Sequence, residues 1–194
     1  MLKYIPNVLT ILRLLLIPFI VLYIFSGHYI LAFMFFTLSG LTDIADGFIA
    51  RKFNFVSNFG KLMDPLADKL TQIGTLTSLV ITDIIPIWIL LIVLLKEFVM
   101  IVGASFLYGK DVVVYSKWYG KLATVLFYIA IVISLLAKQF NVTGIWNQVD
   151  FYLYCLALVV TIFALIMYIK DLYQKGFIDK EDLKKEVTID KKEK

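Results

Sequence analysis

The sequence predicts an all-α, polytopic integral membrane protein in which six transmembrane helices form one bundle. Of its 194 residues, 61% are hydrophobic and 18% are charged, and the mean hydropathy is +0.87. These values lie far from those of soluble globular domains. Six apolar runs each reach about 20 residues, the length that crosses a bilayer. The runs fill most of the chain, so no room is left for a separate soluble domain.

The predicted spans are 6–26, 29–49, 62–82, 85–108, 118–138 and 149–169. Pro6 suits the first turn of a helix, where its missing N–H costs nothing. The first run is apolar over a full spanning length, which predicts a retained helix rather than a cleaved signal peptide. Beyond Lys170, lysines and acids alternate densely with few large apolar residues. We therefore expect a membrane domain over residues 1–170 and a charged tail over 171–194.

Cationic residues predict the orientation in the membrane. An even number of spans places both termini on one side, and cations in short loops mark the cytoplasmic side. The turns on the opposite side contain no lysine or arginine, with Lys138 at their margin. The sequence thus predicts a multi-pass protein of the cell membrane with both termini in the cytoplasm, and nothing in it indicates a nucleic-acid partner. The cations on the terminal side are Lys3, Arg51, Lys52, Lys61, Lys110 and Lys117.

The segment from Thr42 to Leu70 reads TDIADGFIARKFNFVSNFGKLMDPLADKL and concentrates the acidic residues of the predicted spans. Asp43 and Asp46 are three residues apart, and Asp64 and Asp68 are four apart, so each pair shares one helical face. Across a helical hairpin the two acidic faces can meet at the cytoplasmic end. The sequence therefore predicts a cytoplasm-facing active site.

Four converging carboxylates would repel one another unless cations compensate their charge. Two divalent ions would balance four negative charges, and oxygen ligands favour Mg²⁺ or Mn²⁺. No histidine or cysteine lies nearby, which argues against zinc. A carboxylate-bound metal pair suits phosphoryl chemistry, because it stabilises both the entering and the leaving oxygen.

The neighbouring residues fit a phosphorylated substrate. Gly47 and Ala50 leave room beside the acidic face, as Gly60 does on the other helix, and Arg51 offers a planar fork for phosphate oxygens. Pro65 predicts that its helix starts or bends there. Taken singly, the aspartates could instead be helix caps, and the small residues could serve helix packing.

Arg13 lies about two turns into the first apolar run, where a charge is costly unless it is paired or near the interface. Two interpretations stay open. Its side chain could extend to the cytoplasmic surface, or it could face the acidic cluster.

The segment resembles the CDP-alcohol phosphatidyltransferase family, whose motif is D-x2-D-G-x2-A-R-x8-G-x3-D-x3-D. The resemblance extends to the six-span layout and to the opening Pro6-Asn7-x-Leu9-Thr10-x-x-Arg13. Every fixed position of the motif is present: Asp43, Asp46, Gly47, Ala50, Arg51, Gly60, Asp64 and Asp68.

The resemblance implies transfer of a phosphatidyl group from CDP-diacylglycerol to an alcohol hydroxyl, with release of CMP. It implies that Asp43, Asp46 and Asp64 are metal ligands and that Asp68 is a ligand or the general base. It also implies a homodimer. The residues expected to contact the CDP-lipid are Asp46, Gly47, Ala50, Arg51 and Gly60.

Within the family the chain is most similar to bacterial enzymes that use glycerol 3-phosphate and form phosphatidylglycerophosphate. Related cardiolipin synthases use phosphatidylglycerol instead. The chain has Lys96-Glu97 where Arg-Glu is usual, and Lys121-Leu122-Ala123-Thr124 where Lys-x-Lys-Thr is common, so one expected cation is missing. Lys96 and Glu97 could also simply pair with each other. The candidate cations for an acceptor phosphate are Lys117, Lys121, Lys96 and Arg13.

Single features of the sequence are also compatible with two other classes of protein. Acids inside a membrane also mark ion pathways, so the chain could be a small cation carrier. A carrier predicts acids spread over the membrane depth, whereas the four aspartates gather at one end. A non-catalytic lipid-binding or scaffold protein would have no need of Asp68.

Overall fold

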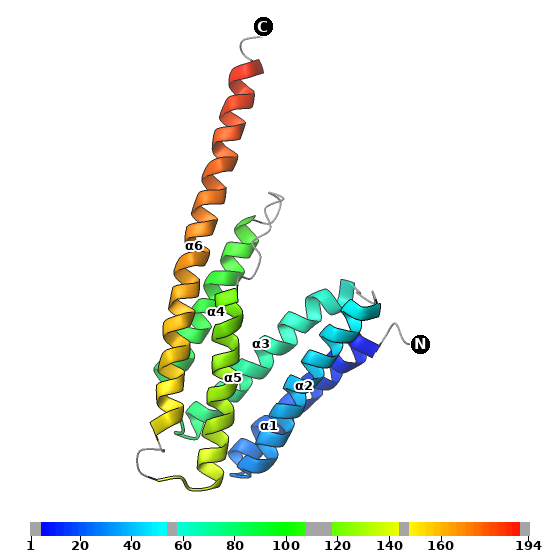
Figure 1. The fold of residues 1–194 in the computed structure, drawn as a ribbon, viewed down its shortest axis with the longest axis vertical. Coiled ribbons are helices and arrows are strands. Elements are labelled where there is room, and N and C mark those ends of the chain that lie inside the picture. The colour runs from blue at the N-terminus through cyan, green and yellow to red at the C-terminus, as the bar shows by residue number, and fades with distance from the viewer. Residues whose placement is uncertain (1–4, 54–57, 108–117, 144–147, 191–194) are drawn as a thin grey trace.

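The computed structural model describes residues 5–53, 58–107, 118–143 and 148–190, and the side chains of 7–48, 63–102, 118–143 and 148–170. All regular structure in these ranges is α-helical, which confirms the predicted fold class (Figure 1). The helices are α1 (Ile5–Phe25), α2 (Tyr29–Phe53), α3 (Asn58–Ile81), α4 (Ile87–Leu107), α5 (Trp118–Gln139) and α6 (Val149–Asp190).

Four helices are long and apolar enough to cross a membrane within the described residues, which makes the protein polytopic. These stretches are Asn7–Phe25, Tyr29–Phe48, Trp118–Gln139 and Val149–Lys170. Helix α3 carries Asp64, Asp68 and Lys69 in its described part, and the described side chains of α4 end at residue 102. That α3 and α4 also cross the bilayer stays a prediction.

Three helices end in the same way at one end of the bundle. After α1, α3 and α5, one residue adopts a positive φ: Gly27 (72°), Asp83 (54°) and Asn141 (48°). The next N–H then donates to the carbonyl five residues back, from His28 to Tyr23, from Ile84 to Leu79 and from Val142 to Ala137. This pairing satisfies carbonyls that a helix end leaves free. The chain can therefore turn back sharply at this end.

Helices α1, α2 and α3 form one group and α4, α5 and α6 a second group, and the two groups diverge toward the end that holds the N-terminus (Figure 1). Helix α1 packs on α2 and α3, α6 packs on α4 and α5, and α2 contacts α5 across the groups. At Gly74 a Cβ atom would lie 3.3 Å from Ile17 Cγ2, so α1 and α3 approach closely there.

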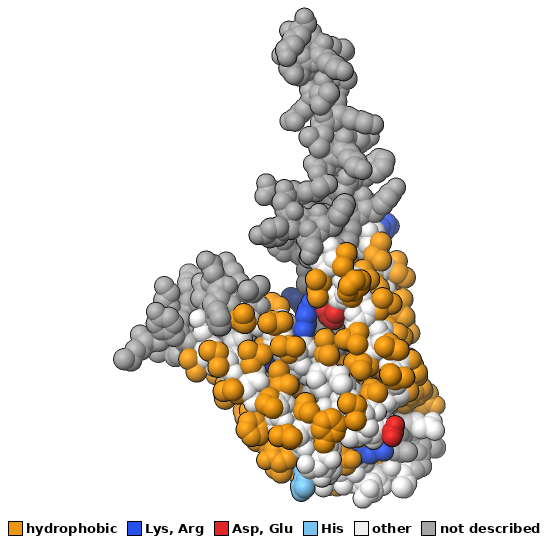
Figure 2. Space-filling model, turned by 180° about the vertical axis from the view of Figure 1, so that it is seen from behind, with side chains coloured by type: hydrophobic (Ala, Val, Ile, Leu, Met, Phe, Trp, Pro, Cys, Tyr) orange, Lys and Arg blue, Asp and Glu red, His pale blue; other side chains and the backbone are white. Residues whose placement is uncertain are grey.

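Apolar side chains cover the outside of the bundle as well as filling its core. Ile20, Phe36 and Leu76 are buried between the helices, while Leu15 and Leu22 of α1 are each 59% exposed. Few charged side chains interrupt the hydrophobic surface in the space-filling view (Figure 2). Such a surface is suited to contact with lipid rather than with water.

Two sequence expectations differ from the structure or go beyond it. Pro65 does not start its helix, because α3 begins earlier, at Asn58, and Pro65 lies inside it. Helix α6 continues to Asp190, so the predicted boundary between residues 1–170 and 171–194 falls within a helix and stays a prediction. The six cations used for the orientation lie outside the residues whose side chains are described.

Replacing Ile20 by Ala tests the packing of the bundle. Inside a membrane, the loss comes from missing packing contacts and not from exposure to water. Because Ile20 is fully buried, we expect the free energy of unfolding to fall by about 2 kcal/mol or more. Leu22→Ala removes a similar volume from the exposed face and should change it little. Thermal unfolding in detergent measures both variants, and equal losses would contradict this packing.

Candidate active site

Arg13 lies at the centre of the acidic cluster. Of its two interpretations, the structure therefore favours the one in which the side chain faces the aspartates over the one in which it extends to the membrane surface. Its side chain is fully buried, and its guanidinium contacts carboxylates of two other helices. Nη2 lies 2.8 Å from Asp43 Oδ1 and 2.6 Å from Asp46 Oδ2, while Nη1 lies 2.6 Å from Asp68 Oδ1. One cation therefore joins α1 to α2 and α3.

The fourth aspartate is held by the same helix as the guanidinium. The hydroxyl of Thr10, one helical turn before Arg13, donates a hydrogen bond to Asp64. Thr10 is buried and Asp64 is half-buried. The structure thus brings all four predicted aspartates to one face of α1. The spacing of Thr10 and Arg13 in the sequence could have indicated this, since residues three apart share a helical face.

Only part of the predicted CDP-lipid site can be described. Asp46 is buried and Gly47 half-buried, both on α2. Ala50 and Arg51 follow in the last turns of α2, and Gly60 lies in the first turn of α3. Their side chains lie outside the described residues, so the contacts expected of them stay predictions.

The predicted acceptor cations are not brought together in the described part of the structure. Lys96 pairs with its neighbour Glu97, the alternative that the sequence left open. Lys121 is exposed on α5, and Lys117 lies outside the described residues.

Lys69 is a cation that the sequence interpretation passed over. Its Nζ lies 2.6 Å from Glu97 Oε2, so α3 is tied to α4 one residue beyond Asp68. Glu97 is buried at 5% exposure and is flanked by two lysines. Buried charges need partners of opposite sign, but the sequence did not say that Lys69 would be one. Its position directly after a motif aspartate was the only available indication.

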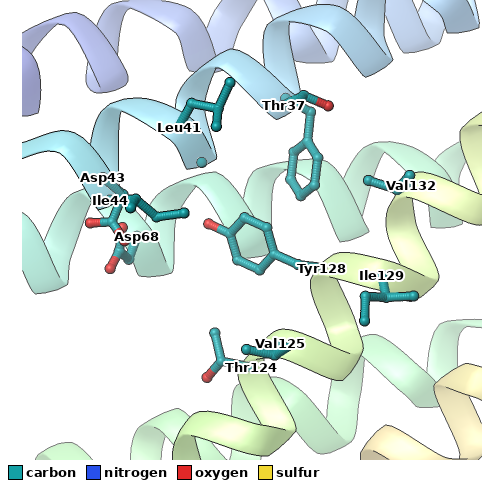
Figure 3. A pocket seen from close by; sticks show the side chains of 12 residues that line it. Thr37, Leu41, Asp43, Ile44, Asp68, Thr124, Val125, Tyr128, Ile129 and Val132 are labelled. Atoms are coloured by element: carbon teal, nitrogen blue, oxygen red, sulfur yellow. The ribbon is translucent and has the colours of Figure 1, made fainter.

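A cavity of about 370 Å³ opens beside the carboxylates. Asp43 and Asp68 form its polar end, and the hydroxyl of Tyr128 points toward them from α5 (Figure 3). The Tyr128 ring packs on Phe36, with ring centroids 4.9 Å apart. No motif position indicates Tyr128, and only the packing of α5 on α2 brings it here. The remaining lining residues are Thr37, Gly40, Leu41, Ile44, Thr124, Val125, Ile129 and Val132.

The residues present fit a hard divalent cation in their chemistry. Four carboxylates supply the oxygen ligands that Mg²⁺ and Mn²⁺ prefer, and the guanidinium shows that a single cation can be shared by three of them. As they stand, however, no three acidic, histidine or cysteine side chains among the described residues are arranged to hold a metal ion. The guanidinium is the cation that the carboxylates bind in this structure.

Comparisons with known proteins agree with the motif. A sequence profile of the CDP-alcohol phosphatidyltransferase family matches residues 3–169. A Mycoplasma genitalium protein named CDP-diacylglycerol–glycerol-3-phosphate 3-phosphatidyltransferase is 34% identical over 151 residues, covering 74% of this chain and 64% of its own. A Rickettsia typhi protein of the same name is 37% identical, covering 71% of this chain and 79% of its own.

A Streptomyces coelicolor protein named cardiolipin synthase (CMP-forming) is 38% identical over 76 residues, covering 39% of this chain and 35% of its own. The present chain therefore spans less than two thirds of the Mycoplasma and Streptomyces relatives. The match to the family profile, in contrast, extends over most of the chain and includes the four aspartates and Arg13. The chain belongs to the CDP-alcohol phosphatidyltransferase family.

Proposed function

We propose that the protein is a phospholipid-synthesising enzyme that transfers a phosphatidyl group from CDP-diacylglycerol to glycerol 3-phosphate, giving phosphatidylglycerophosphate and CMP. The observation that carries this proposal is the meeting of the motif aspartates from α2 and α3 beside a largely apolar cavity. A diphosphate linked to two acyl chains needs a cationic centre next to an apolar surface. Family membership and the names of the Mycoplasma and Rickettsia relatives support the same reaction.

Members of the family generally depend on a divalent metal. In the proposal, Asp43, Asp46 and Asp64 hold two divalent ions, either Mg²⁺ or Mn²⁺. Asp68 is a further ligand or the base. When bound, such ions neutralise the diphosphate and stabilise the oxygens that enter and leave. The gathering of four carboxylates on one face of α1 supports this assignment.

Asp68 is proposed as the general base. Its carboxylate lines the cavity, so an alcohol there can be reached. Asp68 takes the proton of the acceptor hydroxyl while the oxygen of that hydroxyl forms a bond to the phosphatidyl phosphorus. The bond from phosphorus to the CMP oxygen breaks, and CMP leaves. On the cytidine side, Asp46, Gly47, Ala50, Arg51 and Gly60 are proposed to contact the CDP part.

For the acceptor phosphate we propose Lys121, in the first turn of α5, and Lys117, which precedes Trp118 in the sequence. Lys121 is exposed, and no carboxylate of the described residues forms an ion pair with it. Lys96 shares its charge with Glu97, and the Nη atoms of Arg13 contact carboxylates, so both are weaker candidates. The name of the Streptomyces relative keeps phosphatidylglycerol, and hence cardiolipin synthesis, as the second candidate.

The proposed setting is the cell membrane, with both termini in the cytoplasm and the aspartates on that side. Homodimer formation is part of the proposal as well. The apolar outer surface of the bundle suits both lipid and a second copy of the chain (Figure 2).

The reaction is tested by mixing the purified protein with CDP-diacylglycerol, Mg²⁺ and one alcohol at a time. We expect CMP release with glycerol 3-phosphate and none after the metal is removed by a chelator, because the diphosphate then lacks its compensating charge. If CMP is released with phosphatidylglycerol but not with glycerol 3-phosphate, phosphatidylglycerol is the acceptor. If no acceptor, including serine and inositol phosphate, gives CMP release, the proposed enzymatic activity is refuted.

Asp68→Asn tests the base. The amide cannot accept the hydroxyl proton, so we expect the turnover rate to fall by about a hundredfold or more, while CDP-diacylglycerol still binds. Asp83→Asn is the matched control, since Asp83 lies exposed in the turn after α3 and asparagine tolerates its positive φ. Wild-type turnover in Asp68→Asn would remove its assigned role.

Lys121→Gln tests the acceptor site. Loss of a charged hydrogen bond to phosphate should raise the KM for glycerol 3-phosphate by about tenfold. The turnover rate should change less, because the lost contact binds substrate and transition state alike. Lys138→Gln removes the same charge from the opposite end of α5 and should leave KM unchanged. Equal KM values in both variants would place the acceptor phosphate elsewhere.

A further inference from the structure

The geometry points to Arg13 as a built-in counter-cation, which holds the aspartates together without metal and gives them up when a divalent metal binds. The inference rests on the proposed metal site, and it assigns Arg13 a positioning role there. Two observations carry it: the complete burial of the side chain, and the sharing of one guanidinium by three carboxylates.

The carboxylates need a cation at all times. Asp46 is 2% exposed, and its partners on α2 and α3 lie close enough to share one guanidinium. Negative charges at such distances repel one another strongly where lipid and protein exclude water. Without Arg13 and without metal, nothing would offset this repulsion, and α2 and α3 would lose the ion pairs that link them to α1. Arg13 therefore preserves the site in its metal-free form.

Arg13 and a metal ion compete for the same carboxylates. A metal ligand must offer its oxygen directly to the ion, whereas Oδ1 of Asp43, Oδ2 of Asp46 and Oδ1 of Asp68 already contact the guanidinium. In this arrangement no three acidic, histidine or cysteine side chains among the described residues are placed to hold one metal ion together. Binding of metal thus requires that at least some of these ion pairs break.

Replacement of the Arg13 guanidinium by divalent ions is favoured by their higher charge. It is also favoured because Arg13 does not make all of its possible hydrogen bonds. A guanidinium contributes one positive charge against four carboxylates, whereas each divalent ion contributes two. The Nε of Arg13 is buried and has no hydrogen-bond partner among the described residues, so the arginine does not satisfy all of its donors where it lies. Arg13 therefore binds the carboxylates less strongly than an arginine with all of its donors satisfied would.

Competition of this kind lowers the apparent affinity for metal. If the carboxylates are free of Arg13 only a fraction of the time, the apparent Kd rises by the inverse of that fraction. Removing the guanidinium removes this cost and also makes the site more negative. A neutral residue at position 13 should therefore tighten metal binding, although it loosens the metal-free protein.

The test is to measure Mn²⁺ binding to the full-length protein in detergent. Electron paramagnetic resonance reports the binding, because the signal of the free ion is lost as it binds. We expect Arg13→Gln to bind Mn²⁺ about tenfold more tightly than the wild type, and to unfold at a lower temperature than the wild type when no metal is present. Lys138→Gln, which removes one cation from the opposite end of the bundle, should match the wild type. An affinity in Arg13→Gln equal to or below that of the wild type would overturn the counter-cation role.

Mn²⁺ binding to the wild-type protein distinguishes failure of this inference from failure of the proposed function. Binding of Mn²⁺ to the wild type supports the metal site whatever Arg13 does. Binding to Arg13→Gln alone would mean that Arg13 never gives the carboxylates up, and it would overturn both the exchange and the metal site of the wild type. If neither protein binds, both proposals fail. Should Arg13→Gln not fold, Arg13→Lys keeps the charge but cannot bridge three carboxylates. It should bind Mn²⁺ several-fold more tightly, and wild-type affinity would overturn the role.

Nuclear magnetic resonance observes the exchange directly, because Arg13 and Arg51 are the only arginines of the chain. In protein labelled with ¹⁵N-arginine, Arg51→Lys assigns the side-chain signals of Arg13. Adding Mg²⁺ should shift these signals at the concentrations over which the site fills. Unchanged Arg13 signals at saturating Mg²⁺ would overturn the inference.

Discussion

A single buried guanidinium is the interaction on which the functional end of this protein depends. Arg13 lies inside an apolar bundle and is shared by Asp43, Asp46 and Asp68. Acid groups this close together are costly in a membrane, and so is an arginine two turns into a transmembrane helix. Each is tolerated because the other is present. The packing of α1 against α2 and α3 follows from the same requirement, since the three helices must bring their charges together.

Charge pairing also connects the two groups of helices. Lys69 comes directly after Asp68 and pairs with Glu97 on α4, so the proposed base sits next to a link between the groups. Asp68 itself faces a cavity whose opposite wall is α5. The proposed catalytic end is therefore assembled from most of the bundle, although the recognisable motif occupies only α2 and α3.

Much of this arrangement follows from the sequence. Apolar runs of spanning length predict the helices, because a chain in lipid must satisfy its backbone internally. Aspartates three and four residues apart predict two acidic faces. What the sequence leaves undecided is which cation compensates them. Metal and arginine satisfy the same charge requirement, so Arg13 could be placed only through the packing of α1. The link from Lys69 to Glu97 and the position of Tyr128 depend likewise on contacts between distant helices. Of the two expectations for Pro65, a helix start or a bend, the structure excludes the start, because proline is tolerated near the beginning of a helix and α3 already begins at Asn58; the bend stays a prediction.

The cavity beside the carboxylates has a consequence for how substrate and product travel. Several of its apolar lining residues, among them Leu41, Ile44 and Val125, are also exposed on the outer surface that faces lipid. In the proposed reaction, a lipid substrate arrives by sliding sideways within the leaflet, and its acyl chains never have to cross water. The phospholipid product of that reaction leaves along the same lateral path. Only the proposed nucleotide product and a water-soluble acceptor exchange with the aqueous phase, so the two kinds of molecule reach the site from different directions.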